Sequence, residues 1–306
     1  RDLNADEGTH IQAAAGILNE CAFEVTAGGV VFENLAFLGS LDAGLTSASR
    51  AIVWSSGTGG EVVGCTFRQW KGNCVEVGSS ASNIHFRGSV FAQSEKNGAY
   101  VQGNHASFDG RCEFRDNTQR GLYALGADNL AVENCFFYLN DWEGLSVQDG
   151  NRALIKGNHA VDNGFSGIKI RSGSRHEAIA NHCYGNGTDT GVGDIDRAGI
   201  TVTEGSHIHV CHNHLGDADT SPTQRYGVAV GSSLESAKIL DNSFHGNDAG
   251  ETSIPSGAAT AVEIDIVADV TGVNPASMAS AAGTVGLSSA GAKAATKAAP
   301  KAKGAI

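Results

Sequence analysis

One short segment of this sequence carries two basic residues that could bind or activate a ligand. Residues 167–171 read Gly-Ile-Lys-Ile-Arg, with apolar and polar side chains alternating. Side chains alternate between the two faces of a β-strand, so Lys169 and Arg171 should point the same way, out into water. Two outward cations on a chain of net charge −12 favour an anionic ligand such as a uronic acid carboxylate. Ordinary solvated side chains are the alternative interpretation.

Eliminating or epimerising a uronic acid needs a cation at its carboxylate, a base for the C5 proton and an acid. Lys169 or Arg171 could neutralise the carboxylate, and Tyr123, His176 or a lysine of lowered pKa could be the base. Asp149 lies in a nearby turn. The candidate catalytic residues are therefore Lys169, Arg171, Tyr123, His176 and Asp149, and the candidate substrate contacts are Tyr100, Gln102, Gln148, Trp142, Arg197 and Thr201.

A glycoside hydrolase would instead need two carboxyl groups about 5–10 Å apart. Asp141 and Glu143 flank Trp142, whose ring could stack on a sugar. A solvated polar turn explains the same three residues, so the hydrolase stays an alternative.

Metal binding is a weaker option. Carboxylates at Asp194, Asp196, Asp217 and Asp219 could chelate Ca²⁺ together with loop carbonyls, although Asp-x-Asp is also an ordinary turn pattern. The histidines of residues 207–214 fall on different faces and at a bend, so they do not converge as a tetrahedral site requires. We assign no metal ligands, and calcium is the one cofactor left open.

A repeat positions these residues. From about residue 28 to 267 one sequence pattern recurs. It consists of a short strand, a bend, a second short strand with a central aromatic residue, and a third strand of the form Gly-apolar-x-apolar. Asn, Gly or Asp stands at most bends, as a left-handed corner requires. The bends are placed at Asn34, Gly64, Gly88, Arg111, Asn134, Gly157, Asn181, His212 and Asp241, which are 23 to 31 residues apart. Such a period with three short strands indicates a solenoid of about nine coils.

The positions of the bends predict two columns of side chains inside the coils. Three residues after the bend we expect a buried stack of Phe37, Phe67, Phe91, Phe114, Phe137, Ala160, Tyr184, Leu215 and Phe244. One residue after it we expect a ladder of Leu35, Cys65, Ser89, Cys112, Cys135, Asn158, His182, Asn213 and Asn242. Stacked amides satisfy one another between coils. The cysteines are expected to be buried thiols, with a Cys112–Cys135 disulfide left open.

The layout resembles the right-handed parallel β-helix of the pectate-lyase-like superfamily. The resemblance rests on the Asn/Gly bends, the inner ladders and the Gly-apolar-x-apolar strand, and it covers residues 28–267. It implies an all-β fold. In that fold the Gly-apolar-x-apolar strand, counted as the first strand of each coil, forms the floor of a polysaccharide groove. Coils stack at about 4.8 Å, close to the length of one sugar. No residue matches a lyase motif of the superfamily well enough to carry a role across.

The remaining segments differ in composition. Residues 1–27 are expected to form a helical cap or a degenerate first coil, and 268–306 form an Ala/Gly/Ser/Lys-rich tail. Residues 187–198 and 216–226 are insertions, and the first should wall the face that carries Lys169 and Thr201.

Composition narrows the function. No apolar run is long enough for a membrane span, and the acidic balance argues against nucleic acid as a partner. We expect an extracellular, cell-surface or virion protein, monomeric or trimeric, with a polysaccharide as its partner. A lyase, epimerase or hydrolase is one class; a non-catalytic carbohydrate-binding or structural spike is the other.

Overall fold

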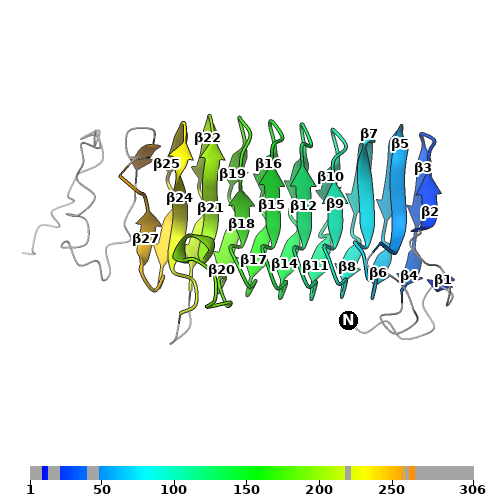
Figure 1. The fold of residues 1–306 in the computed structure, drawn as a ribbon, viewed down its shortest axis with the longest axis horizontal. Helices are drawn as coiled ribbons and strands as arrows, with labels where there is room; N and C mark the ends of the chain where they lie inside the picture. The colour runs from blue at the N-terminus through cyan, green and yellow to red at the C-terminus, as the bar shows by residue number, and fades with distance from the viewer. Residues whose placement is uncertain are drawn as a thin grey trace, which may run out of the picture.

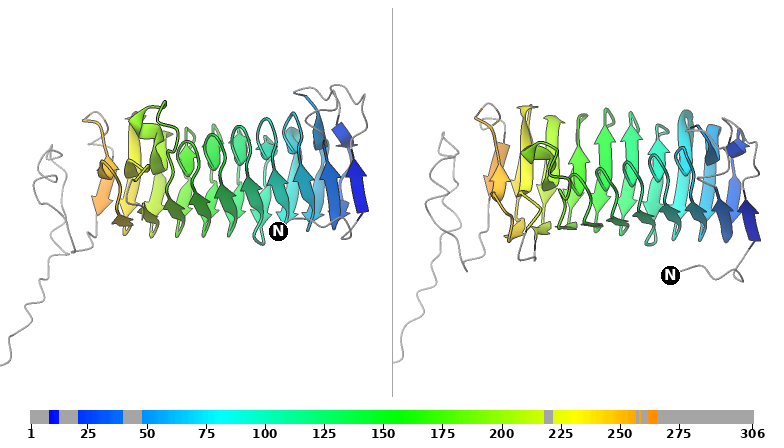
Figure 2. Two further views of the ribbon diagram at one scale, coloured as in Figure 1. Left: turned by 90° about the horizontal axis from the view of Figure 1, so that it is seen from below. Right: turned by 60° about the horizontal axis from the view of Figure 1, so that its bottom comes forward.

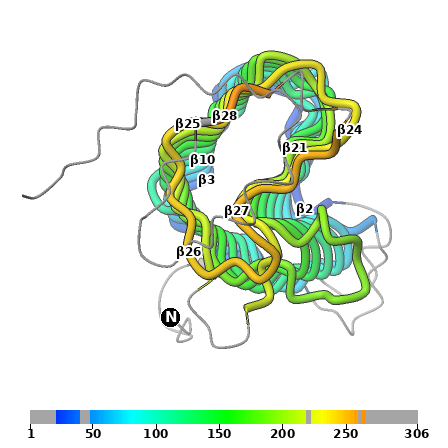
Figure 3. Tube along the Cα trace, turned by 90° about the vertical axis from the view of Figure 1, so that its left-hand side faces the viewer, coloured from blue at the N-terminus to red at the C-terminus, as the bar shows by residue number. Residues whose placement is uncertain are grey.

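The protein is a long stack of coils, seen side-on in Figure 1 and from two further directions in Figure 2. The computed structural model describes residues 9–12, 21–39, 48–217, 222–256, 258 and 262–265. Within them every strand pairing is parallel, and the strands form two sheets of ten and eighteen strands. Viewed along the axis, successive coils superimpose on one outline (Figure 3). The fold is the parallel β-helix that the repeat predicts.

Each coil contributes one strand to the ten-stranded sheet. Its strands run in the order β1 (Thr9–Gln12), β4 (Leu35–Leu38), β6 (Thr66–Arg68), β8 (Val90–Ala92), β11 (Glu113–Arg115), β14 (Phe136–Tyr138), β17 (His159–Val161), β20 (His182–Tyr184), β23 (His214–Gly216) and β26 (Ser243–His245).

The eighteen-stranded sheet contains two runs of strands. The first run is β2 (Cys21–Val25), β5 (Arg50–Val63), β7 (Val75–Arg87), β9 (Ala99–Val101), β12 (Leu122–Leu125), β15 (Leu145–Gln148), β18 (Ile168–Ile170), β21 (Ala198–Gly205), β24 (Tyr226–Leu234) and β27 (Gly250–Ser253). The second is β3 (Val30–Glu33), β10 (Ser107–Asp109), β13 (Ala131–Glu133), β16 (Leu154–Lys156), β19 (Glu177–Ile179), β22 (Ile208–Cys211), β25 (Ala237–Leu240) and β28 (Val262–Asp265). The long strands β5 and β7 join the runs, because each pairs with members of both.

The corner before each strand of the ten-stranded sheet from β4 to β26 is left-handed, as predicted. Asn134 has φ 55° and Gly157 has φ 65°. One corner was misplaced by a residue: Ala180, not Asn181, carries the positive φ of 53°. The correction moves Asn181 into the inner ladder, makes Cys183 the buried central residue of β20, and turns His182 and Tyr184 outward.

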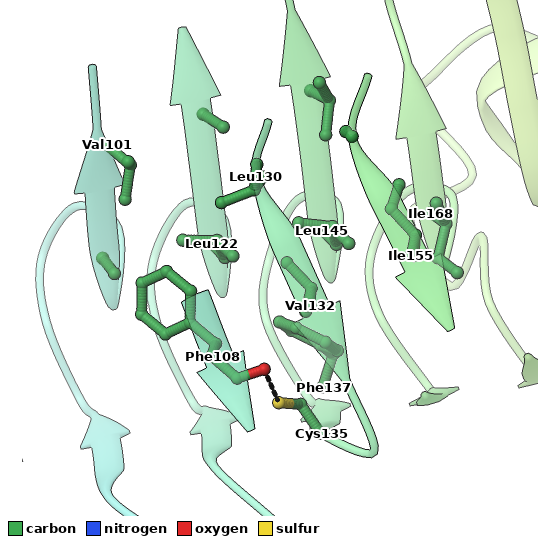
Figure 4. Packing of buried hydrophobic residues seen from close by; sticks show 14 of the residues in the cluster. Val101, Phe108, Leu122, Leu130, Val132, Cys135, Phe137, Leu145, Ile155 and Ile168 are labelled. Atoms are coloured by element: carbon green, nitrogen blue, oxygen red, sulfur yellow. Dashed lines mark hydrogen bonds between the residues drawn. The ribbon is translucent and has the colours of Figure 1, made fainter. Parts of the chain in front are cut away.

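The aromatic stack is buried, which confirms the proposed phase. Phe67, Phe91, Phe114 and Phe137 have no exposed surface, and neighbouring rings stack with centroids 4.7–5.2 Å apart. Branched aliphatic side chains from the other strands fill the rest of the interior, as Figure 4 shows around Phe137. Dispersion contacts between flat rings at this spacing hold successive coils in register.

The asparagine ladder satisfies buried polar groups between coils. The Asn158 side-chain amide donates to Asn181 Oδ1 at 3.0 Å and to the Val132 carbonyl at 2.9 Å. In the same way, the side-chain amide of Asn181 donates to Asn213 Oδ1, and that of Asn213 donates to Asn242 Oδ1. A second ladder at the other end of the same strands, which the sequence analysis did not identify, links Asn117, Asn140, Asn163 and Asn186 at 2.9 Å per step.

The cysteine part of the inner ladder consists of buried thiols. Cys65, Cys112 and Cys135 are free cysteines, and the Cys135 thiol donates to the Phe108 carbonyl at 3.5 Å (Figure 4). A hydrogen bond from the Cys135 thiol to Cys112, together with burial, raises the pKa of Cys135, which keeps it protonated.

The first described residues form strands. β1 and β2 pair in parallel with β4 and β5, the arrangement of a first coil. Residues 1–8 and 13–20 of the expected cap, and the tail 268–306, lie outside the described residues.

Replacing Phe114 by Ala should lower the free energy of unfolding by about 3–5 kcal/mol, because the cavity lies inside a ring stack that cannot close around it. Chemical denaturation measures the loss. Phe136→Ala, a truncation on the outer face of the same sheet, is the matched control and should cost clearly less. Equal losses for the two variants would contradict the inward phase of Phe114.

Replacing Gly157 by Val should lower stability by about 1–2 kcal/mol, since a β-branched residue resists a left-handed corner. An added Cβ would also lie 2.6 Å from Asn134 Oδ1. Gly193→Ala is the control, because Gly193 has φ −64° and open space around its Cα. The assignment of the corner fails if both variants unfold at the same denaturant concentration.

Candidate functional site

The outward side chains of the first run of strands form the surface to which the sequence analysis assigned the site; we call it the first-strand face. In-register pairing aligns these side chains in two columns. One contains Glu76, Tyr100, Tyr123, Ser146, Lys169, Thr201 and Ala229. The other contains Gln102, Leu125, Gln148, Arg171 and Thr203, of which Leu125 and Gln148 are direct partners.

Aromatic and amide groups occupy the accessible part of this face. The rings of Tyr100 and Tyr123 lie 5.5 Å apart, tilted by 36°, and both are half-buried. The Tyr123 hydroxyl donates to Gln148 Oε1 at 2.9 Å. Burial raises the pKa of Tyr100, and the neighbouring Tyr123 adds to the shift. The structure thus joins Tyr100, Tyr123 and Gln148 as predicted, with Gln102 half-buried beside them.

Arg171 is a cation that forms no ion pair with the described part of the chain. It follows β18 on the first-strand face and is half-buried. Its backbone N–H donates to the Val147 carbonyl, and no carboxylate of the described residues forms an ion pair with its guanidinium. A guanidinium in this setting offers several donors to an anion that arrives from solution.

Lys169 and Thr201 are not exposed, and this corrects the sequence analysis. Lys169 is 3% exposed and Thr201 is fully buried. Lys169 Nζ lies 3.5 Å from Glu143 Oε1 and is hydrogen-bonded to Asp196 Oδ1. The alternation of the strand correctly predicted that both point away from the interior. It could not predict that another segment covers them.

The inserted segment 187–198 is that cover, so it lies on the first-strand face instead of beside it. Thr201 Oγ1 donates to the Ile195 carbonyl at 2.8 Å, and Ser166 Oγ donates to the Asp196 carbonyl at 3.0 Å. Arg197 secures the base of the segment, because its guanidinium donates to the Gly187 and Thr223 carbonyls. The predicted substrate contact Arg197 is therefore occupied in holding the chain, and a linear ligand along the axis meets this segment after Arg171.

A buried ionic cluster underlies the same region. Arg120 Nε lies 2.8 Å from Glu143 Oε2, and Glu143, 1% exposed, contacts Lys169 in turn. The Arg120 guanidinium lies over the rings of Tyr123 at 4.5 Å and Trp142 at 4.7 Å. Burial lowers the pKa of Arg120, and the Glu143 carboxylate opposes that shift. The sequence analysis missed Arg120, although opposite charges one period apart, at 120 and 143, were a visible signal.

The two remaining catalytic candidates lie elsewhere. His176 is fully buried; its Nδ1 accepts from the Ala153 N–H at 3.1 Å and its Nε2 contacts the Ser172 carbonyl at 3.2 Å. Burial lowers its pKa, so the neutral ring serves as a structural acceptor. Asp149 is exposed in the turn after β15 and accepts from Ser172 Oγ at 2.6 Å.

Asp141 and Glu143 do not act as a pair. Glu143 faces the ionic cluster, while Asp141 lines a shallow depression of about 530 Å³ together with Trp142, Asp162 and Asp189. Burial raises the pKa of Asp141, and the charge of Asp189 adds to it. Trp142 lies between this depression and Arg120, with its second face stacked on Phe165 at 5.9 Å.

The described aspartates that were considered as calcium ligands bind other groups of the protein. Asp194 pairs with Arg225 at 3.2 Å, Asp196 pairs with Lys169, and Asp217 accepts from the Thr223 N–H at 2.8 Å. Asp219 lies outside the described residues. Within the part of the chain that the structure describes, no group of three or more His, Cys, Asp or Glu side chains is arranged to hold a metal ion.

Comparison with known proteins agrees with this architecture. Two overlapping matches, residues 50–192 and 110–264, align the sequence with the family described as the right-handed beta helix region. The chain belongs to the right-handed β-helix family. A search of curated proteins gives no match. In the described ranges, no helix has the length and apolar character of a membrane span.

Solved structures with similar folds share little sequence with this β-helix. The A-module of the mannuronan C-5 epimerase AlgE6 of Azotobacter vinelandii is 14% identical, with a TM-score of 0.57 over 81% of this chain and 76% of that one. The Dettilon tailspike protein is 14% identical, with a TM-score of 0.52 over 84% of this chain and 62% of that one. At these identities the likeness establishes the fold alone.

Lys169→Met should lower the free energy of unfolding by about 3–5 kcal/mol, because it leaves Glu143 and Asp196 without their shared cation in a buried site. Denaturant unfolding is the measurement. Arg171→Ala, which removes the same charge two residues away, should change stability by no more than about 0.5 kcal/mol. A Lys169→Met protein as stable as wild type would show that segment 187–198 does not cover this position.

Proposed function

We propose that the first-strand face binds an acidic polysaccharide and that the protein acts on it. The observation that carries the proposal is Arg171, a half-buried guanidinium on this face with no carboxylate partner among the described residues. A cation left unpaired on a chain of net charge −12 is suited to an anion from outside the protein. A uronic acid carboxylate matches the guanidinium in shape and charge.

The neighbouring side chains suit a sugar polymer. Tyr100 and Tyr123 supply aromatic surface with a hydroxyl, and Gln102 and Gln148 supply amide donors and acceptors. The repeat distance between coils, about 4.8 Å, is close to one sugar, so successive coils can contact successive residues of one chain. The similar fold of a module of a mannuronan C-5 epimerase is consistent with an acidic polysaccharide as the ligand.

We assign the chemical roles within this proposal as follows. Arg171 neutralises the carboxylate of the bound uronic acid, which lowers the pKa of the C5 proton beside it. Tyr123 is the proton-transfer group on the accessible face. In its deprotonated form Tyr123 takes the C5 proton; in a lyase the C4–O bond then breaks and Tyr123 gives that proton to the departing C4 oxygen, which leaves an unsaturated product, whereas in an epimerase water supplies a proton to the opposite side of C5. Lys169 and Thr201 close the end of the face instead of contacting sugar.

Recognition without turnover is the second candidate, and one observation favours it. Lys169, Glu143, Asp196 and Arg120 neutralise one another in a buried cluster, which leaves few titratable groups free on the face. A polysaccharide-binding spike or surface protein would need no more than Arg171 and the polar columns. Under either candidate we propose that the protein is extracellular, at a cell surface or on a virion.

One panel separates these candidates. Alginate, polygalacturonate and a neutral polysaccharide are incubated with the protein, and ultraviolet absorbance of unsaturated ends, reducing ends and proton NMR spectra of the polymer are recorded. Unsaturated ends would indicate a lyase. Changed anomeric NMR signals without cleavage would indicate an epimerase, and new saturated reducing ends would indicate a hydrolase. Binding without any product establishes the non-catalytic candidate.

Arg171→Ala should weaken binding of the acidic polymer by about tenfold to a hundredfold, the range expected for a lost charged hydrogen bond. Binding is measured by isothermal titration calorimetry at low and high salt, and the difference between variants should shrink as salt screens the wild-type contact. Lys156→Ala, an exposed lysine at the end of β16, is the matched control and should bind normally. Undiminished binding by Arg171→Ala would reject the first-strand face as the site.

A further inference from the structure

Three histidines form a column on the outer face of the ten-stranded sheet, away from the first-strand face. His159, His182 and His214 are in-register partners on β17, β20 and β23. Their ring centroids are 4.8 and 4.7 Å apart, with interplanar angles of 7° and 20°. His159 and His214 are exposed and His182 is half-buried. We call these three residues the imidazole column.

The stacking turns ring edges, not ring faces, toward solvent. Ring nitrogens are therefore presented once per coil along the axis, while the faces are covered by neighbouring rings. Phe136 closes one end, 5.2 Å from the ring of His159, and Ser243 Oγ lies 2.7 Å from His214 Nδ1 at the other. The edges can donate hydrogen bonds to a ligand but cannot serve as a flat stacking surface for a sugar.

The charges around the column leave it without a counter-ion. Arg111 extends it as a permanent cation, 5.7 Å above the ring of Phe136, and forms no ion pair within the described ranges. Glu113, next in register beyond Phe136, accepts from the Tyr138 hydroxyl at 3.2 Å. Asp241 pairs with His212 at 3.6 Å. The other titratable groups on the neighbouring strands are Arg115, which pairs with Asp116, and Tyr184 and His245.

Imidazole is the side chain that can gain charge in mild acid, which makes the imidazole column a pH-sensitive surface. An unperturbed imidazole titrates near pH 6.5, and burial together with the two neighbouring rings lowers the pKa of His182. Each proton that one ring takes up in acid opposes protonation of the next ring. A bound anion relieves that repulsion, so binding and protonation strengthen each other.

We propose that the imidazole column is a second, acid-gated binding site for a linear polyanion, and that its ligand is a polyuronate lying along the helix axis. The coil repeat places protonated rings about 4.8 Å apart, close to the spacing of one carboxylate per sugar. Several weak contacts in register then act as one strong contact, so the polymer binds far more tightly than its monomer. The site lies on a different sheet from Arg171 and does not depend on the function proposed above.

The test uses the Arg171→Ala protein, in which the first-strand face is impaired. Binding of polygalacturonate and of galacturonate monomer is measured by isothermal titration calorimetry at pH 7.5 and pH 5.0, where the polymer carboxylates remain ionised. Polymer affinity should rise at least tenfold at pH 5.0, with no comparable rise for the monomer. Introducing His159→Asn, His182→Asn and His214→Asn together should abolish the rise.

A second triple variant removes the same number of histidines elsewhere. His105→Asn, His207→Asn and His209→Asn lie on exposed positions outside the column and should keep the rise in affinity. Circular dichroism melting at both pH values checks that each variant is folded. The proposal is overturned if the rise persists in the column variant, is lost equally in both triple variants, or is absent from the parent. None of these outcomes bears on whether Arg171 binds polymer at neutral pH, which the earlier experiment measures separately.

Discussion

The in-register stacking of coils is the constraint on which the rest of the molecule depends. Parallel strands about 4.8 Å apart place each side chain directly above its counterpart in the preceding coil. Inside, this turns single phenylalanines into a ring stack and single asparagines into a hydrogen-bonded ladder. The ladders matter because a buried amide is costly unless both its donors and its acceptor are used, and here the coil on either side uses them. A frame held in this way can carry surface columns in fixed register.

The phase of this frame could be read from the sequence, and its one error has a physical origin. Most corners carry Asn, Gly or Asp, so Asn181 was taken as the corner of its coil, whereas Ala180 has the left-handed backbone. Asn181 is needed one position later, where its amide links Asn158 to Asn213. The buried hydrogen bonds thus outweigh the modest strain of alanine at the corner. The shift by one residue is also what brings His182 to the surface between His159 and His214.

The candidate site was predicted less completely, because alternation along a strand gives a direction and not an exposure. Lys169 points away from the interior as expected, but Asp196, from an insertion of irregular length, lies against it. Backbone carbonyls of that insertion bind Thr201 and Ser166, and such contacts leave no pattern in the sequence. Arg171, two residues after Lys169, is only half-buried. Pairs at one period, such as Arg120 and Glu143, are the part of the site that a sequence does reveal.

Stacking in register also restricts where charge can stand on the surface. Like charges in neighbouring coils would lie about 4.8 Å apart along a whole column, which is destabilising. Different parts of the surface avoid this repulsion in different ways. Arg120 is followed by Glu143, and Lys238 by Glu263, so signs alternate. In the imidazole column no such alternation exists among the described residues. The repulsion that acid creates there meets no carboxylate partner among the described residues, whereas Arg171, flanked in its column by Gln148 and Thr203, lies near enough to Arg120 for the two cations to repel each other, a repulsion that an anionic ligand would relieve.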